Sequence, residues 1–243
     1  MDAATPTSAG PVALVGSGEF TPAMAEVDRL LLAGRPPRAV FLPTAAAQEG
    51  TERIDYWVRL GRDHYHDLGV EPVPLLVLDR PSADDPALAA EVAGAGLIYL
   101  SGGDPAYLAE TLAGTRVFAA IRAAWEGGAA LAGCSAGACA LTNVTFGVVP
   151  PLGRRPGLGL VPGLVVLPHF DAIERWWPGI VDRWRDELEP GELLVGIDEN
   201  TALVGGSGRF VVHGPGAAWV IDGERRRYPA GSEIDLSLTT PHS

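Results

Sequence analysis

The segment L-A-G-C-S-A-G-A-C-A-L, at residues 131–141, holds a pattern that can carry nucleophilic chemistry. Gly133, Ser135 and Gly137 match G-x-S-x-G where an apolar run ends and a run of small residues begins. At such a strand-to-helix turn the serine has a strained backbone that only small neighbours tolerate, and its hydroxyl points away from the sheet. The N–H of Ala136, at the start of the helix, would bind a developing oxyanion. We therefore predict that Ser135 is a nucleophile.

Two other interpretations of this segment compete with that prediction. A pentapeptide pattern also occurs in turns without chemistry, so Ser135 could merely cap a helix in a tight, glycine-rich packing turn. Cys134 is a second candidate nucleophile, but it lies one residue out of register with the flanking glycines. We expect it to be a buried structural thiol.

A serine nucleophile needs a base, normally histidine, and the histidine needs an acid that fixes its tautomer. Of the five histidines, His64 and His66 lie in a polar helical stretch and are expected at the surface, and His242 lies in the tail. His169 ends the run L-V-V-L-P-H, and His213 lies at a predicted hairpin tip. Open α/β sheets place ligand sites at the carboxyl ends of strands, which favours His169 over His213.

Three acids could orient the histidine. Asp171 follows His169 closely but is also placed to cap a helix. Asp198 and Glu199 end the run L-L-V-G-I-D-E-N, and strand alternation would point one of them into the site and the other away. The residue types alone leave this choice open, and a rival triad of Ser135, Asp198 and His213 has the chain order of α/β-hydrolases.

The elements that must position these residues alternate between short apolar runs and amphipathic segments, as in βα units around a parallel sheet. The runs are apolar on both faces, as in strands covered by helices on both sides. Predicted strands begin at Val12, Ala39, Val73, Leu97 and Ala129. Predicted helices span 22–32, 51–68, 86–93, 105–113, 117–125 and 171–188, with N-caps at Thr21 and Asp104 and a capping box of Asp171 with Glu174.

After Asn200, glycine-punctuated pieces predict antiparallel hairpins appended to the main sheet. We therefore expect one α/β domain over residues 1–243, with three α/β/α layers around a mostly parallel central sheet, and flexible ends at 1–10 and 239–243.

Composition restricts the partners. The formal charge of −12 disfavours nucleic acid and anionic membranes, which need clustered Lys and Arg. No apolar run approaches the ~20 residues that span a bilayer, and no secretory signal precedes the first strand, so we expect a cytoplasmic protein. The two cysteines are too few for structural zinc. We predict no metal and no cofactor, and a homodimer is compatible with the sequence, which does not fix the oligomeric state.

Further motifs give the chain a family resemblance: G-S-G-E at 16–19, Y-L-S-G-G-D at 99–104, G-C-S-A-G, H-F at 169–170 and G-I-D-E-N-T-A-L at 196–203. These motifs occur in order along most of the chain. In them the chain resembles the serine peptidases that include peptidase E (aspartyl dipeptidase) and cyanophycinase. Their flavodoxin-like fold is similar to that of class I glutamine amidotransferases. The resemblance implies Ser135 as nucleophile, His169 as base and Glu199 as acid, with N–H groups of Gly103 and Ala136 forming the oxyanion hole.

Departures from the family pattern concern the substrate. Cyanophycinases have Asp-Gln where this chain has Leu167-Pro168, and of their arginines beyond the histidine only Arg175 has a counterpart. Their G-G-D-Q loop here ends in Asp104-Pro105. The sequence therefore disfavours cyanophycin.

We expect a small peptide, isopeptide or amide substrate, cleaved through an acyl-enzyme, with Asp104 and Arg175 as substrate-binding residues. Arg175 beside Trp176 and Trp177 could hold a carboxylate or an amide, although we favour core packing for the two tryptophans. A catalytically silent relative that binds a peptide or metabolite, and a glutaminase-like amidotransferase that uses Cys134, are the alternatives.

Overall fold

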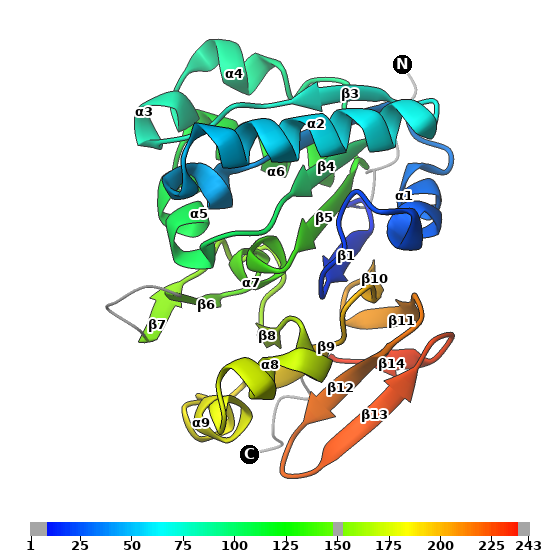
Figure 1. Cartoon of the computed structure of the whole chain (residues 1–243), viewed down its shortest axis with the longest axis vertical. Coiled ribbons are helices and arrows are strands. Elements are labelled where there is room, and N and C mark those ends of the chain that lie inside the picture. Colours follow the sequence, from blue (N-terminus) through cyan, green and yellow to red (C-terminus); the bar gives the residue numbers. More distant parts are fainter. Residues whose placement is uncertain (1–8, 148–152, 238–243) are drawn as a thin grey trace, which may run out of the picture.

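Five parallel strands form one side of the main sheet in the computed structural model, which describes residues 9–147 and 153–237. The sheet has eight strands in the order β14-β11-β10-β1-β5-β4-β2-β3 (Figure 1). The parallel strands are β1 (Val12–Val15), β2 (Arg38–Leu42), β3 (Glu71–Pro74), β4 (Leu97–Leu100) and β5 (Ala130–Cys134). Antiparallel strands β10 (Ala202–Gly206), β11 (Arg209–His213) and β14 (Glu233–Asp235) extend it beyond β1.

Successive residues of each central strand enter different apolar cores. Leu14 packs in one buried cluster with residues of α5, α6 and α7, whereas Val15 packs in another with residues of α1 and α2. This is why the strands are apolar on both faces, and it confirms the predicted α/β layering around a mostly parallel sheet. The helices are η1 (Pro22–Met24), α1 (Ala25–Leu32), η2 (Thr44–Glu49), α2 (Thr51–Asp67), α3 (Arg80–Ala83), α4 (Pro86–Ala90), α5 (Pro105–Leu112), α6 (Arg116–Glu126), α7 (Ala136–Leu141), α8 (Phe170–Trp176) and α9 (Ile180–Asp186).

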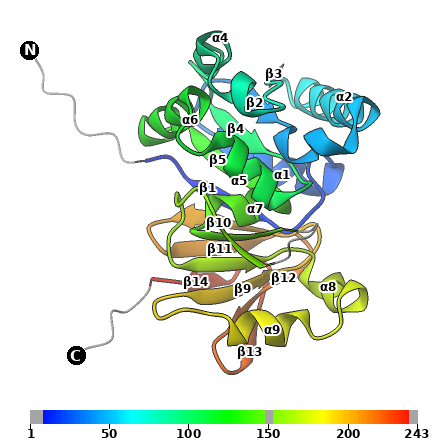
Figure 2. The same cartoon turned by 90° about the vertical axis from the view of Figure 1, so that its left-hand side faces the viewer.

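A second sheet, in the order β13-β12-β9-β8, lies with α8 and α9 at the opposite end of the molecule from α2 and α4 (Figures 1 and 2). Its strands are β8 (Leu164–Leu167), β9 (Leu193–Ile197), β12 (Ala217–Ile221) and β13 (Arg225–Pro229), and β6 (Val144–Gly147) pairs with β7 (Gly153–Pro156). The hairpin β10–β11 extends the main sheet as predicted. The prediction was wrong for the hairpin β12–β13, because β12 pairs with β9 in the second sheet.

The predicted helix over 171–188 is two helices. The helix is interrupted at Pro178, which has no N–H to donate, and at Gly179, whose φ of 78° is left-handed. The predicted capping box is also wrong, because the side chain of Asp171 accepts a hydrogen bond from the N–H of Glu199 instead. Asp104 caps α5 as predicted, whereas Thr21 makes no side-chain cap to η1.

His64 corrects a further prediction, since it is buried and not solvated. Its Nε2 lies 2.7 Å from the carboxylate of the buried Asp28, between α2 and α1. The predicted flexible ends fall mostly outside the described residues, although Gly10 is held by hydrogen bonds with Trp125. A single domain stays a prediction. In the part of the chain that is described, no helix has the length and apolar character to cross a membrane.

Candidate active site

Ser135 stands between the end of β5 and the start of α7, with φ 50° and ψ −109°. The two flanking glycines allow this turn. A Cβ on Gly133 would lie 2.4 Å from the carbonyl oxygen of Gly137, and one on Gly137 would lie 2.1 Å from that of Leu100. The strained serine backbone predicted from G-x-S-x-G is therefore present, enforced by close backbone packing on both sides.

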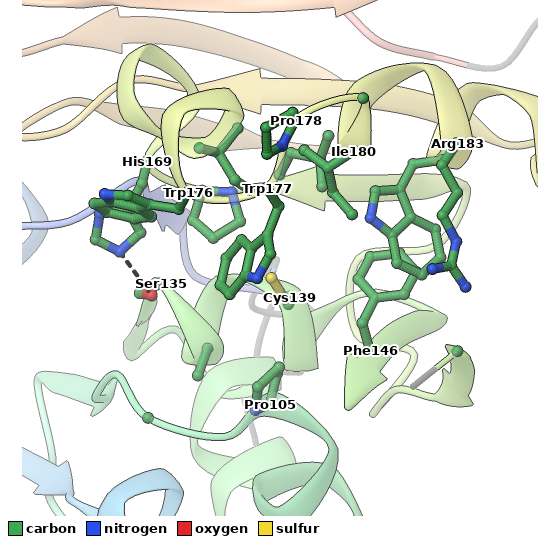
Figure 3. Close-up of a pocket in the computed structure, with 18 residues that line it drawn as sticks. Pro105, Ser135, Cys139, Phe146, His169, Trp176, Trp177, Pro178, Ile180 and Arg183 are labelled. Atoms are coloured by element: carbon green, nitrogen blue, oxygen red, sulfur yellow. Dashed lines mark hydrogen bonds between the residues drawn. The ribbon is translucent and has the colours of Figure 1, made fainter. Parts of the chain in front are cut away.

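His169 lies beside Ser135 and follows a strand of the second sheet. It follows β8 with a left-handed φ of 52°, and its Nε2 lies 3.0 Å from the Ser135 hydroxyl oxygen (Figure 3). Its Nδ1 lies 2.9 Å from Oε1 of Glu199, which follows the parallel neighbour β9. Both residues thus stand at the carboxyl ends of adjacent parallel strands, where α/β sheets gather functional groups.

The hydrogen-bond partners of His169 indicate a role for each ring nitrogen. An ionised carboxylate only accepts hydrogen bonds, so Nδ1 of His169 carries the proton directed at Glu199. Nε2 is then the acceptor for the Ser135 hydroxyl. This arrangement can draw a proton from the serine.

The other acids and the rival histidine have different surroundings. The carboxylate of Asp198 accepts hydrogen bonds from the N–H of Ala217 and the indole N–H of Trp219, both at 2.9 Å. Asp171 accepts from the backbone of Glu199 and so helps to hold the acid's loop. His213 ends β11 on the main sheet opposite Ala202, and desolvation lowers its pKa.

Glu19 supports the loop that carries Gly103. Only 5% exposed, it accepts a hydrogen bond from the N–H of Gly102 at 2.8 Å and another from the Cys134 thiol at 2.7 Å. Gly103 has φ 139°, and a Cβ there would lie 2.3 Å from the carbonyl oxygen of Ala45. We did not assign a role to Glu19 from the sequence, although it ends the G-S-G-E motif.

The two cysteines are buried and hold their protons. Burial raises the pKa of the Cys134 thiol well above its ordinary value, and that of Cys139 to about 12. The thiol of Cys139 donates to the carbonyl oxygen of Val166 on β8. This confirms the prediction that Cys134 is a buried thiol. Across residues 9–147 and 153–237, no cluster of three His, Cys, Asp or Glu side chains is placed to bind a metal.

A cavity of about 810 Å³ opens beside Ser135 and His169, with Gly103 and Ala136 in its wall (Figure 3). The core packing favoured for the tryptophans is wrong: Trp176 and Trp177 are 52% and 50% exposed and line this cavity.

Asp104 and Arg175, the predicted substrate-binding residues, are not among the described residues that line the cavity. Asp104 caps α5 through the N–H of Tyr107, and Arg175 is exposed on α8. Their substrate-binding roles stay predictions.

Known proteins share both the sequence pattern and the architecture. A model of peptidase family S51 matches residues 12–211. The cyanophycinase of Synechococcus elongatus is 30% identical over 193 residues, which cover 74% of this chain and 58% of that protein. The cyanophycinase of Geminocystis herdmanii is 27% identical over 209 residues, covering 81% of this chain and 74% of the relative. The chain thus spans less than two thirds of the length of the Synechococcus relative.

Solved structures agree in fold. The crystal structure of a peptidase from an acI-B1 actinobacterium superposes with a TM-score of 0.86 at 37% identity, covering 95% of this chain and 98% of that one. A peptidase E candidate from Listeria monocytogenes EGD-e superposes with a TM-score of 0.59 at 17% identity, covering 92% and 100% of the two chains. The second likeness is one of fold alone.

Proposed function

Because the chain belongs to peptidase family S51, we propose that it is a serine-type peptidase that cleaves a small peptide or isopeptide through an acyl-enzyme. The observation that carries the proposal is the run of hydrogen bonds from the Ser135 hydroxyl through His169 to Glu199. Nucleophile, base and orienting acid are the three groups that such a reaction needs.

The reaction begins when the Ser135 oxygen attacks the scissile carbonyl and its proton passes to Nε2 of His169. Glu199 stabilises the imidazolium that forms. The N–H groups of Gly103 and Ala136 hold the tetrahedral oxyanion, at the positive end of α7. His169 then protonates the leaving amine, and a water molecule, activated by the same histidine, hydrolyses the acyl-enzyme.

Neither alternative function gains support from the site. A glutaminase-like reaction through Cys134 needs an accessible thiolate, whereas this thiol is buried and donates to Glu19. A pure binding protein has no use for the hydrogen bond between Ser135 and His169. Action in the cytoplasm and the oligomeric state stay predictions.

Two measurements test the proposal. Diisopropyl fluorophosphate should label the wild-type chain on Ser135 and leave Ser135→Ala unlabelled, and a panel of dipeptides and isopeptides should be cleaved by the wild type alone. Equal labelling of both chains, or turnover that survives Ser135→Ala, would overturn it.

A further inference from the structure

The break between α8 and α9 builds one wall of the cavity next to the nucleophile. The helix stops at Trp176 and restarts at Ile180, and Trp177, Pro178 and Ile180 line the cavity that also contains Ser135 (Figure 3). Phe146 of β6 lies at the opposite end of the cavity from Ser135 (Figure 3), where its ring packs against Trp184 of α9. Cys139 of α7 also lines the cavity. The walls are therefore almost wholly apolar and aromatic.

The charges around the cavity offer no partner for an acidic side chain close to the nucleophile. Arg183 is the one Lys, Arg, Asp or Glu among the described lining residues. Its Nε donates to Glu187 at 3.0 Å, and its guanidinium lies 5.6 Å from the centre of the Trp184 ring. Figure 3 places Arg183 at the opposite end of the cavity from Ser135. A carboxylate close to the nucleophile would lose its hydration without meeting an unpaired cation.

The cavity also offers no partner for a basic side chain. Among the described residues, no Asp or Glu lines the cavity, and the Cys139 thiol is uncharged with its hydrogen directed at Val166. Burial of an ammonium or guanidinium group there would go uncompensated.

The exposed tryptophan surface points the same way. Trp177 is half exposed although it is large and apolar, and it forms part of the cavity beside the reacting groups. Apolar surface left open at a catalytic site marks the place where a ligand is buried. The volume of about 810 Å³ accommodates an aromatic side chain together with part of the peptide backbone.

We propose that the cavity binds an apolar, aromatic-sized side chain of the substrate residue next to the scissile bond, and that Trp177 and Ile180 set this preference. The inference rests on the proposed function and names its substrate class. Each methylene group buried in such a cavity favours binding by about fourfold. We therefore expect Phe or Leu to exceed Asp by on the order of 100-fold in kcat/KM.

The first test compares matched peptides. Two series carry Phe, Leu, Ala, Asp or Arg, one on the acyl side and one on the amine side of the scissile bond. A preference for Phe and Leu in either series supports the inference and assigns the cavity to that side. Equal rates in both series, or faster cleavage next to Asp or Arg, would overturn it.

The second test uses variants in the cavity wall. Ile180→Arg supplies an unpaired cation, so the preference should move from Phe towards Asp. Trp177→Ala should raise KM more for Phe peptides than for Ala peptides. Leu30→Ala, which truncates an exposed apolar side chain on α1, is the control and should change neither ratio. Unchanged Phe-to-Asp ratios in both cavity variants would contradict the assignment.

A third measurement separates this inference from the proposed function. Calorimetry on Ser135→Ala, which needs no turnover, should show N-acetyl-phenylalaninamide binding more tightly than N-acetyl-aspartamide. Failure of diisopropyl fluorophosphate to label the wild type would overturn the proposed function. Labelling without any preference for the apolar ligand would overturn the cavity assignment alone.

Discussion

The hydroxyl oxygen of Ser135 lies 3.0 Å from Nε2 of His169, although the two residues follow strands of different sheets. Ser135 directly follows β5 of the main sheet, and His169 follows β8 of the second sheet. The Cys139 thiol joins the same two parts by its hydrogen bond to Val166. The distance between nucleophile and base is therefore set by the packing of α7 against β8.

The pairing of Ser135 with His169 predicts which histidine is required. Ser135→Ala and His169→Gln should each lower kcat by about 10⁴-fold or more, because either change removes the activated nucleophile. His213→Gln serves as the matched control and should keep kcat within a few-fold of wild type. Steady-state kinetics on the best peptide measures all three, and a loss in His213→Gln equal to that in His169→Gln would restore the rival triad.

Adjacent acids should separate catalysis from stability. Glu199→Gln should reduce kcat by about 10⁴-fold with little change in the folded structure, because an amide no longer fixes the working tautomer of His169. Asp198→Asn should instead lower the free energy of unfolding by about 1–3 kcal/mol, because one of the two N–H donors, from Ala217 or Trp219, loses its acceptor.

Urea denaturation and kinetics on both variants check this contrast. If Asp198→Asn proves inactive yet stable, and Glu199→Gln active, the two roles are reversed.

The choice between these acids shows where sequence reasoning ends. Strand alternation predicts that Asp198 and Glu199 point in opposite directions, but it cannot say which one reaches the site. That is decided by Ala217 and Trp219, which β12 brings against β9 from a later hairpin. The elbow at Ser135 was predictable because its cause is local: a strand end, two glycines and a helix start.

The wall of the cavity was missed for a different reason. The periodicity over 171–188 continues through Trp177, so it predicts one helix with its tryptophans in the core, and the Pro178-Gly179 pair was the available signal of a break. His64 was likewise misplaced, because its partner Asp28 lies on another helix. A contact between two helices decides the position of His64, and a single sequence does not reveal it, whereas the helix break has a local cause in Pro178 and Gly179.

Glu19 is expected to act as a positioning residue for the oxyanion site. Glu19→Gln should lower kcat by roughly tenfold and leave KM nearly unchanged, because a neutral amide accepts more weakly from the Gly102 N–H and cannot also accept from the Cys134 thiol, while the cavity keeps its lining. A directly lost oxyanion donor costs about 100- to 1000-fold, so an indirect effect should be smaller.

Asp28→Asn is the control for Glu19, since it alters a buried carboxylate that contacts His64 and not the Gly102 loop. This variant should change thermal stability and keep kcat. Equal kcat losses in the two variants would mean that Glu19 acts only through general stability.

The cysteines should resist alkylation over the working pH range. Because burial raises the pKa of Cys139 to about 12, its thiolate fraction rises with pH but is only about 1 in 10⁴ at pH 8. The pKa of Cys134 is raised as well, by burial and by the nearby charge of Glu19.

Iodoacetamide at pH 8 should therefore leave both thiols of the folded protein unmodified and peptidase activity intact, whereas in urea both should react. Mass spectrometry measures the modification. Rapid modification of folded Cys134, with inactivation that glutamine prevents, would instead support the glutaminase-like reaction.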